Sequence, residues 1–221
     1  MKNILFDLYG TLIDIHTDEE QEEFWNELAR RTKKYKEYDA TSLRNKYLEI
    51  CEELSKEKEE IEILDVFEKL FNVNMDEAKR IARIFRKLST EYIRLYPYVK
   101  KLLKELRDKG NKLFVLSNAQ SAFTIPELKK LGVLNLFDGI AISSDYSIKK
   151  PNTNFFKKAI NNFNLKGEIW MIGNDYECDI KPAQGLGLKT LFIKSNLTPP
   201  CKYPATIDGF SWKKIMKILN E

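Results

Sequence analysis

Four places in the sequence carry the polar side chains best suited to chemistry, and each lies in a turn or loop after a short apolar run. These side chains are Asp7, Ser117 with Asn118, Lys149 with Lys150, and Asn174 with Asp175 and Asp179. A carboxylate can act as a nucleophile, and a lysine can balance negative charge on the group that it attacks. Paired carboxylates also suit a hard divalent cation. The set therefore favours attack by a carboxylate on an electrophile whose negative charge is balanced by a lysine and a cation.

The apolar runs before these side chains predict a parallel sheet. Short, continuous apolar segments bounded by turn residues are typical of strands that are buried on both faces. We expect such strands at Asn3–Phe6, Leu113–Leu116, Gly139–Ile142, Ile169–Ile172 and Thr190–Ile193. Strands that alternate with helices form a doubly wound sheet, in which ligands bind beyond the carboxyl ends of the strands. The four polar segments are therefore expected to meet at one edge of one sheet.

The stretch from Thr17 to Leu95 instead has helical periodicity throughout. Apolar residues recur three and four positions apart in four successive segments, and none of the stretch resembles a strand. Thr17–Glu20 matches a capping box at the start of the first helix. We expect a core of residues 1–15 and 96–221, interrupted by a helical domain of residues 16–95.

The composition of the 221-residue chain disfavours several other functions. Its 37 Lys and Arg and 33 Asp and Glu residues are mixed along the chain, so no basic stripe indicates a nucleic-acid partner. His16 is the only histidine and the three cysteines lack a C-x-x-C spacing, which disfavours a Ser–His–Asp hydrolase and a zinc site. No apolar run approaches the roughly 18 residues of a membrane span, and the first residues lack a leader pattern. We expect a cytoplasmic monomer or homodimer that acts on a small molecule, without a membrane partner.

Taken together, the four segments resemble the motifs of the haloacid dehalogenase-like hydrolase superfamily, in order and over essentially the whole chain. FDLYGTL at 6–12 is similar to its D-x-x-G-T motif, and VLSNA at 115–119 to its Ser/Thr motif. KKP at 149–151 is similar to its lysine motif, with Lys150 the better match, and IGNDYECDI at 172–180 to its acidic motif. The resemblance implies an α/β fold: a doubly wound, Rossmann-like parallel sheet with an inserted α-helical cap domain.

The resemblance also implies a role for each of these residues. Asp7 would attack the substrate to form a covalent aspartyl intermediate, Ser117 would hydrogen-bond the transferring group, and Lys150 would neutralise that group and keep Asp7 ionised. The implied ligands of Mg²⁺ are Asp7, the Tyr9 carbonyl, Asp179, and either Asn174 or Asp175, of which the spacing to Asp179 favours Asp175. The remaining substrate-binding residues would be Gly10, Thr11 and Asn118.

Tyr9 departs from the pattern of the superfamily's phosphatases, most of which carry a second Asp at this position. That Asp protonates the leaving group and later activates water. A phenol with an ordinary pKa near 10 is a poor replacement, and loss of a positioned acid–base group costs about 100- to 10,000-fold in rate. Acyl phosphates, aryl phosphates and halides need no such proton. The D-x-Y-G-T pattern around Tyr9 also resembles that of the superfamily's 2-haloacid dehalogenases.

Three functions are therefore compatible with the sequence. The leading hypothesis is a Mg²⁺-dependent phosphatase of a small phosphorylated metabolite, working through Asp7. The alternative is a metal-independent 2-haloacid dehalogenase, which Tyr9 favours and the retained Asp175 and Asp179 disfavour. The arginines available to receive a halide are Arg30, Arg31 and Arg44, for which surface positions are the simpler interpretation. The third hypothesis is a catalytically weak protein that binds ligands at the phosphate site.

Overall fold

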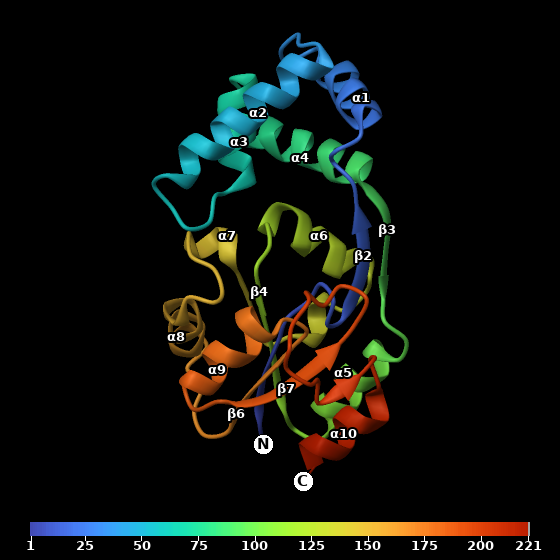
Figure 1. The fold of residues 1–221 in the computed structure, drawn as a ribbon, viewed down its shortest axis with the longest axis vertical. Coiled ribbons are helices and arrows are strands. Elements are labelled where there is room, and N and C mark those ends of the chain that lie inside the picture. The colour runs from blue at the N-terminus through green and yellow to red at the C-terminus, as the bar shows by residue number, and fades with distance from the viewer. Residues whose placement is uncertain (221) are drawn as a thin grey trace.

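A six-stranded parallel sheet forms the centre of the molecule in a computed structural model that describes residues 1–220. Its strands run in the order β5-β4-β1-β6-β7-β8 (Figure 1). Their bounds are β1 Asn3–Phe6, β4 Lys112–Ser117, β5 Gly139–Ile142, β6 Ile169–Gly173, β7 Lys189–Lys194 and β8 Ile207–Asp208. β1 lies between β4 and β6, so the segments that follow these three strands are neighbours at the carboxyl edge of the sheet.

Helices pack on both faces of this sheet, as expected for a doubly wound fold. Ile4 and Phe6 of β1 belong to a hydrophobic cluster with α5 (Val99–Asp108), α6 (Ser121–Lys130) and α10 (Trp212–Asn220). Leu5 points to the other face, into a second cluster with α8 (Thr153–Asn162) and α9 (Lys181–Gly185). Because successive strand side chains alternate between faces, the continuous apolar run of β1 is buried on both sides. The predicted α/β fold is confirmed.

Four further helices form a group of their own, above the sheet in Figure 1. They are α1 (Glu22–Thr32), α2 (Ala40–Ser55), α3 (Ile63–Phe71) and α4 (Met75–Ser89). Their apolar faces bury a separate hydrophobic cluster, which Phe123 of α6 joins from the sheet side. The inserted helical region predicted from the periodicity is thus present.

Two antiparallel strands connect the four helices to the sheet, and they correct the prediction that residues 17–95 contain no strand. β2 (Ile13–Thr17) pairs with β3 (Thr90–Leu95), as the long arrows at the right of Figure 1 show. β3 continues the three-and-four spacing of α4 through its apolar residues, so periodicity alone did not reveal that α4 ends at Ser89. The predicted capping box was also wrong: Thr17 ends β2, and α1 begins at Glu22 with Gln21 at its N-cap position.

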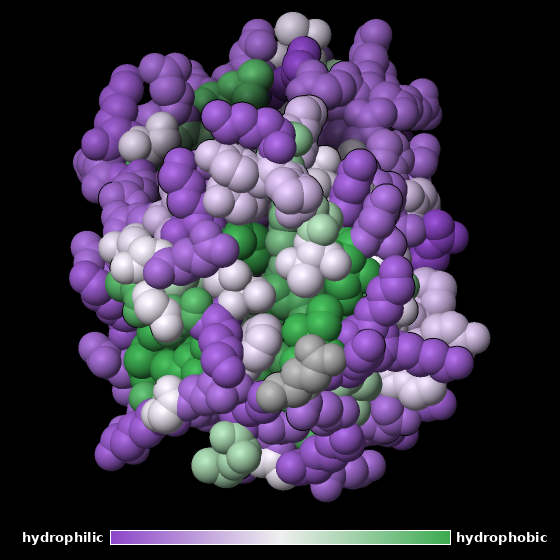
Figure 2. Space-filling model, turned by 60° about the horizontal axis from the view of Figure 1, so that its bottom comes forward, coloured by the Kyte–Doolittle hydropathy of each residue, from purple (hydrophilic) through white to green (hydrophobic). Residues whose placement is uncertain are grey.

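The exposed large hydrophobic side chains lie on several different elements. They include Leu48 of α2, Tyr92 of β3, Tyr98 before α5, and Leu197 and Tyr203 in the loop after β7. Figure 2 shows hydrophilic side chains over most of the face that it draws, with hydrophobic residues visible between them. Among residues 1–220, no helix is long and apolar enough to cross a membrane.

Candidate active site

A cavity of about 170 Å³ opens at the carboxyl edge of the sheet, and all four predicted segments contribute to it. Its lining comprises Asp7, Tyr9, Ser117, Asn118, Lys150, Asn174, Asp175, Cys178 and Asp179, together with Leu197 and Pro199 from the loop after β7. The last two residues were not predicted from the sequence, because nothing in a proline-rich loop indicates which strand ends it covers. The parallel topology therefore brings carboxylates, a hydroxyl and an amine to one place.

Lys150 lies at the centre of this site and bridges two carboxylates. Its Nζ donates to Asp7 Oδ1 at 2.8 Å, to Asp179 Oδ1 at 2.6 Å and to the carbonyl of Leu116 at 2.9 Å. The side chain is only 2% exposed. Burial by itself would lower the pKa of Lys150, but the charges of Asp179 and Asp7 outweigh it and raise that pKa. Lys150 is therefore a protonated cation held against both carboxylates.

Asp7 is buried, and several partners fix the orientation of its carboxylate. Oδ1 accepts from Ser117 Oγ at 3.2 Å as well as from Lys150, and Oδ2 lies 3.1 Å from the hydroxyl of Thr11. Thr11 Oγ1 is also 3.2 Å from Asn174 Oδ1, and its single proton can serve one of the two acceptors at a time. A carboxylate fixed in this way is preorganised to act as a nucleophile.

Two glycines make the close approach of these side chains possible. Gly10 has φ +87°, and a Cβ atom there would lie 2.1 Å from Asn174 Nδ2. A Cβ atom on Gly173, at the end of β6, would lie 2.2 Å from Asp179 Oδ2. Any larger residue at either position would displace a polar side chain of the site.

Asn174 and Asp175 both line the cavity, but their side chains have different partners. Asn174 is 4% exposed and faces Gly10 and Thr11, next to Asp7. Asp175 is half-buried, and its Oδ1 accepts from the backbone N–H of Cys178 at 2.9 Å, which caps the turn of residues 176–180. This turn is a π-helical one and directly precedes α9.

The donor atoms around Asp7 fit a hard cation such as Mg²⁺. Asp7 and Asp179 bring two negative charges, and Lys150 brings one positive charge. Burial raises the pKa of Asp179, with Lys150 opposing and Asp7 reinforcing the shift, so another cation would stabilise its ionised form. Within residues 1–220, no three His, Cys, Asp or Glu side chains are grouped to hold a metal. Mg²⁺ characteristically takes one or two carboxylates and completes its octahedron with water and other oxygens, so the set fits.

The side chain of Tyr9 is engaged in a buried network between the sheet and the inserted helices. Its hydroxyl donates to Glu127 Oε2 on α6 at 2.5 Å and lies 3.0 Å from the hydroxyl of Thr124. Arg86 on α4 donates through Nε to Glu127 Oε1 at 2.6 Å. Burial, reinforced by the charge of Glu127, raises the pKa of Tyr9. The phenol is therefore neutral, and its proton is engaged in the hydrogen bond to Glu127.

Asn118 holds the loop that carries Lys150. Its Oδ1 accepts from the backbone N–H of Lys150 at 2.8 Å, and its Nδ2 donates to the carbonyl of the same residue at 2.8 Å. The amide is therefore engaged in positioning Lys150. Asn118 also borders the cavity, and its contact with substrate stays a prediction.

The three arginines that were candidates for receiving a halide lie on the outside of the inserted helices. Arg30 and Arg31 pair with Glu27, and Arg44 pairs with Glu20, with 70%, 38% and 41% of their side chains exposed. Arg86, which borders a larger cavity between α4 and the sheet, was not singled out from the sequence. Arg86 lies in the last turn of α4, where basic residues are common. Nothing in the sequence therefore marks it as a residue of the site.

An open parallel α/β sheet, a buried carboxylate–lysine centre at its carboxyl edge and an inserted group of helices define the class of this protein. The family model of haloacid dehalogenase-like hydrolases matches residues 1–187. The chain therefore belongs to the haloacid dehalogenase-like hydrolases, as the four motifs predicted.

Two phosphatases are similar to this chain, one over about half of it and one over most of it. A glyceraldehyde 3-phosphate phosphatase of Methanocaldococcus jannaschii is 32% identical over 110 residues, which are 49% of this chain and 48% of that protein. A phosphoglycolate phosphatase of Aquifex aeolicus is 28% identical over 197 residues, 86% of this chain and 83% of that protein. The first of these matches spans only about half of the relative's length.

The fold alone does not separate phosphatases from dehalogenases. The crystal structure of a 2-haloacid dehalogenase from Pseudomonas syringae pv. Tomato DC3000 covers 100% of this chain and 98% of its own, with a TM-score of 0.66 and 19% sequence identity. The reaction must therefore be argued from the side chains of the site.

Proposed function

We propose that this hydrolase is a Mg²⁺-dependent phosphatase of a small phosphorylated metabolite that acts through a covalent intermediate on Asp7. The observation that carries the proposal is the buried bridge from Lys150 to Asp7 and Asp179. It holds a buried carboxylate and a protonated amine in one small cavity, together with a second carboxylate, and this supports a cation site beside Asp7. The phosphatase names of the relatives support the same chemistry.

In the proposed reaction, a carboxylate oxygen of Asp7 attacks phosphorus and the bond from phosphorus to the leaving oxygen breaks, with its electron pair staying on that oxygen. Lys150 and the hydroxyl of Ser117 balance and orient the transferring group. Water then attacks phosphorus, releasing inorganic phosphate, a proton and the free Asp7 carboxylate. Asp7, Asp179, Asn174 and the Tyr9 carbonyl would hold Mg²⁺, which supplies positive charge to the phosphoryl oxygens. We now favour Asn174 over Asp175 because the Asp175 carboxylate caps a turn.

The hydrogen bond from Tyr9 to Glu127 limits which leaving groups can depart. Since the phenol donates its proton to Glu127 and accepts from Thr124, it has no proton to give to a departing alkoxide. We infer that the best substrates have leaving groups of low basicity, such as acyl or aryl phosphates. Residues 16–95 would act as the cap that covers the substrate and excludes water.

Hydrolysis of acetyl phosphate and p-nitrophenyl phosphate tests this function, since both leaving groups depart without a proton. We expect turnover with Mg²⁺, none with EDTA, and a loss of at least about 1,000-fold in Asp7→Asn, because the amide is nearly isosteric but is not a nucleophile. The melting temperature of Asp7→Asn, measured without Mg²⁺, checks that the variant is folded. Release of halide from a 2-haloacid in EDTA, without phosphatase activity, would contradict the proposal in favour of a dehalogenase.

A further inference from the structure

A second, larger cavity adjoins the site at Asp7. It has a volume of about 430 Å³ and lies between the inserted helices and the sheet. Tyr9 and Asn118 line both cavities, so the two spaces meet at these residues. If phosphoryl transfer takes place at Asp7, as proposed above, the leaving group must extend into this second space. Its lining therefore determines which leaving groups the protein accepts.

Among residues 1–220, three charged side chains line this cavity: Glu19, Glu60 and Arg86. Arg86 is the only cation among them, and it is held by Glu127 through Nε at 2.6 Å and Nη2 at 3.5 Å. Glu127 is 10% exposed at its side chain and needs this partner, because an unpaired buried carboxylate is costly. Two of the three guanidinium nitrogens therefore face Glu127, and the charge of this carboxylate offsets that of Arg86.

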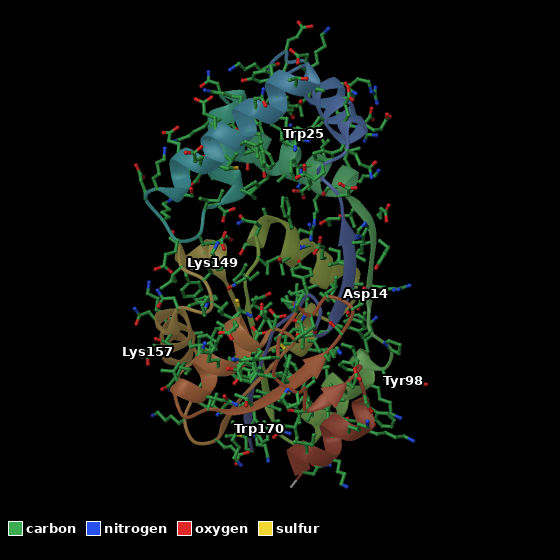
Figure 3. The ribbon with its side chains drawn as sticks, viewed as in Figure 1. Asp14, Trp25, Tyr98, Lys149, Lys157 and Trp170 are labelled. Carbon is green, nitrogen blue, oxygen red and sulfur yellow. The ribbon has the colours of Figure 1, made fainter. Side chains whose placement is uncertain are left out.

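Glu60 has its own partners on the sheet side of the cavity. Its carboxylate accepts from Ser143 Oγ at 3.2 Å and from Gln120 Nε2 at 3.2 Å. Lys149 lies 3.8 Å away, and Figure 3 shows this lysine below the loop that joins α2 to α3. Glu60 thus fastens that loop to the sheet side of the molecule.

Glu19 differs from both, because its carboxylate has no ion-pair partner within 4 Å in the described part of the chain. Burial raises its pKa, while Arg86 and the hydroxyl of Ser89 oppose the shift. The backbone at this point is fixed, since the carbonyl of Glu19 accepts from Trp25 Nε1 at 2.8 Å. A half-buried carboxylate that makes no ion pair within 4 Å, on the wall of a cavity that leads to Asp7, is suited to receive a cation from a ligand.

We propose that Glu19 is a specificity residue that selects phosphorylated substrates whose leaving group ends in an ammonium group, and that the cavity disfavours leaving groups with a second negative charge. Of the three charged side chains that line the cavity, Arg86 is paired with Glu127 and Glu60 with Lys149, so the charge of Glu19 is left in excess. An anionic leaving group meets net repulsion there, whereas an ammonium group completes an ion pair.

Three aryl phosphates with the same reacting bond test this selection: tyramine O-phosphate, 4-ethylphenyl phosphate and 4-(phosphonooxy)phenylacetate. Their phenols are similar in basicity, and only the charge at the far end differs. We expect kcat/KM to be at least about tenfold higher for the ammonium compound than for the carboxylate compound, which corresponds to about 1.4 kcal/mol. In Glu19→Gln the ratio should fall below about threefold. Glu20→Gln is the matched control, because Glu20 is exposed and pairs with Arg44 on the outer surface.

Equal rates for the three compounds, a preference for the carboxylate, or an unchanged ratio in Glu19→Gln would overturn the proposal. Lack of turnover with all three compounds, and also with acetyl phosphate and p-nitrophenyl phosphate, would instead refute the phosphatase function. In that case, titration calorimetry with the product phenols tests separately whether the cavity prefers an ammonium group. Tyramine should then bind more tightly than 4-hydroxyphenylacetate to the wild type but not to Glu19→Gln, and binding of neither phenol would overturn the proposal.

Discussion

Replacement of Arg86 by methionine tests how the inserted helices are joined to the sheet. Glu127 and Arg86 have 10% and 19% of their side chains exposed, and their closest atoms are 2.6 Å apart. Removing one partner of a buried pair costs about 3–5 kcal/mol, because the other charge stays buried. The hydroxyl of Tyr9 still donates to Glu127 in the variant, so we expect the lower end, about 3 kcal/mol. In a chain of this length that corresponds to a fall of about 6–12 °C in melting temperature.

The assay is urea unfolding, supported by thermal unfolding, of wild type, Arg86→Met, Glu127→Gln and the double variant. In the double variant, Glu127→Gln removes the buried carboxylate that Arg86→Met leaves unpaired. The double variant should therefore be more stable than Arg86→Met alone. Arg31→Met is the control, since it breaks an exposed ion pair with Glu27, and exposed pairs contribute little to stability. A loss below about 1 kcal/mol in Arg86→Met, or a double variant less stable than that single variant, would refute the reasoning.

Two further predictions concern other buried charges. Lys150→Met should abolish phosphatase activity and lower the free energy of unfolding by about 3–5 kcal/mol, because Asp7 and Asp179 lose their shared cation. Mg²⁺ should then raise the melting temperature of this variant more than that of the wild type, and no larger rise would contradict the cation site. Asp14→Asn should cost about 1–3 kcal/mol at pH 7, because Asp14 of β2 accepts from Arg94 at 2.7 Å beside β3 (Figure 3). A hydrogen bond from Asn196, with Arg94, lowers the pKa of Asp14 below 3.8 against the effect of burial, so this stability is present above pH 3.8 and is lost on acidification. Unfolding of both proteins between pH 7 and pH 2.5 should show the difference disappear, and a constant difference would refute the assignment.

The sheet and its polar edge were predictable from the sequence because both follow from local patterns. The apolar run before Asp7 indicates a buried strand, and parallel topology then forces the ends of β1, β4 and β6 together. Lys150 follows β5, which lies beyond β4, and its contact with Asp7 also depends on Asn118, which holds its backbone at the end of β4.

The engagement of Tyr9 was not predictable, because its partners carry no local signal. Glu127 and Arg86 lie on the helices α6 and α4, in positions where charged residues usually face solvent. Their pairing depends on how the inserted helices pack against the sheet, which periodicity does not specify. The same packing leaves Glu19 on the wall of the larger cavity. The antiparallel pair β2–β3 escaped detection for a related reason, since β3 continues the apolar spacing of α4.

The central claim is that Asp7 carries the phosphoryl group during turnover. Acid quenching during hydrolysis of acetyl phosphate with Mg²⁺, followed by peptide mass spectrometry, measures this directly. We predict one phosphoryl group on the peptide that contains Asp7, removable by hydroxylamine as an acyl phosphate and absent from Asp7→Asn. Sustained turnover with no phosphoryl group at Asp7, or with full activity in Asp7→Asn, would contradict the account.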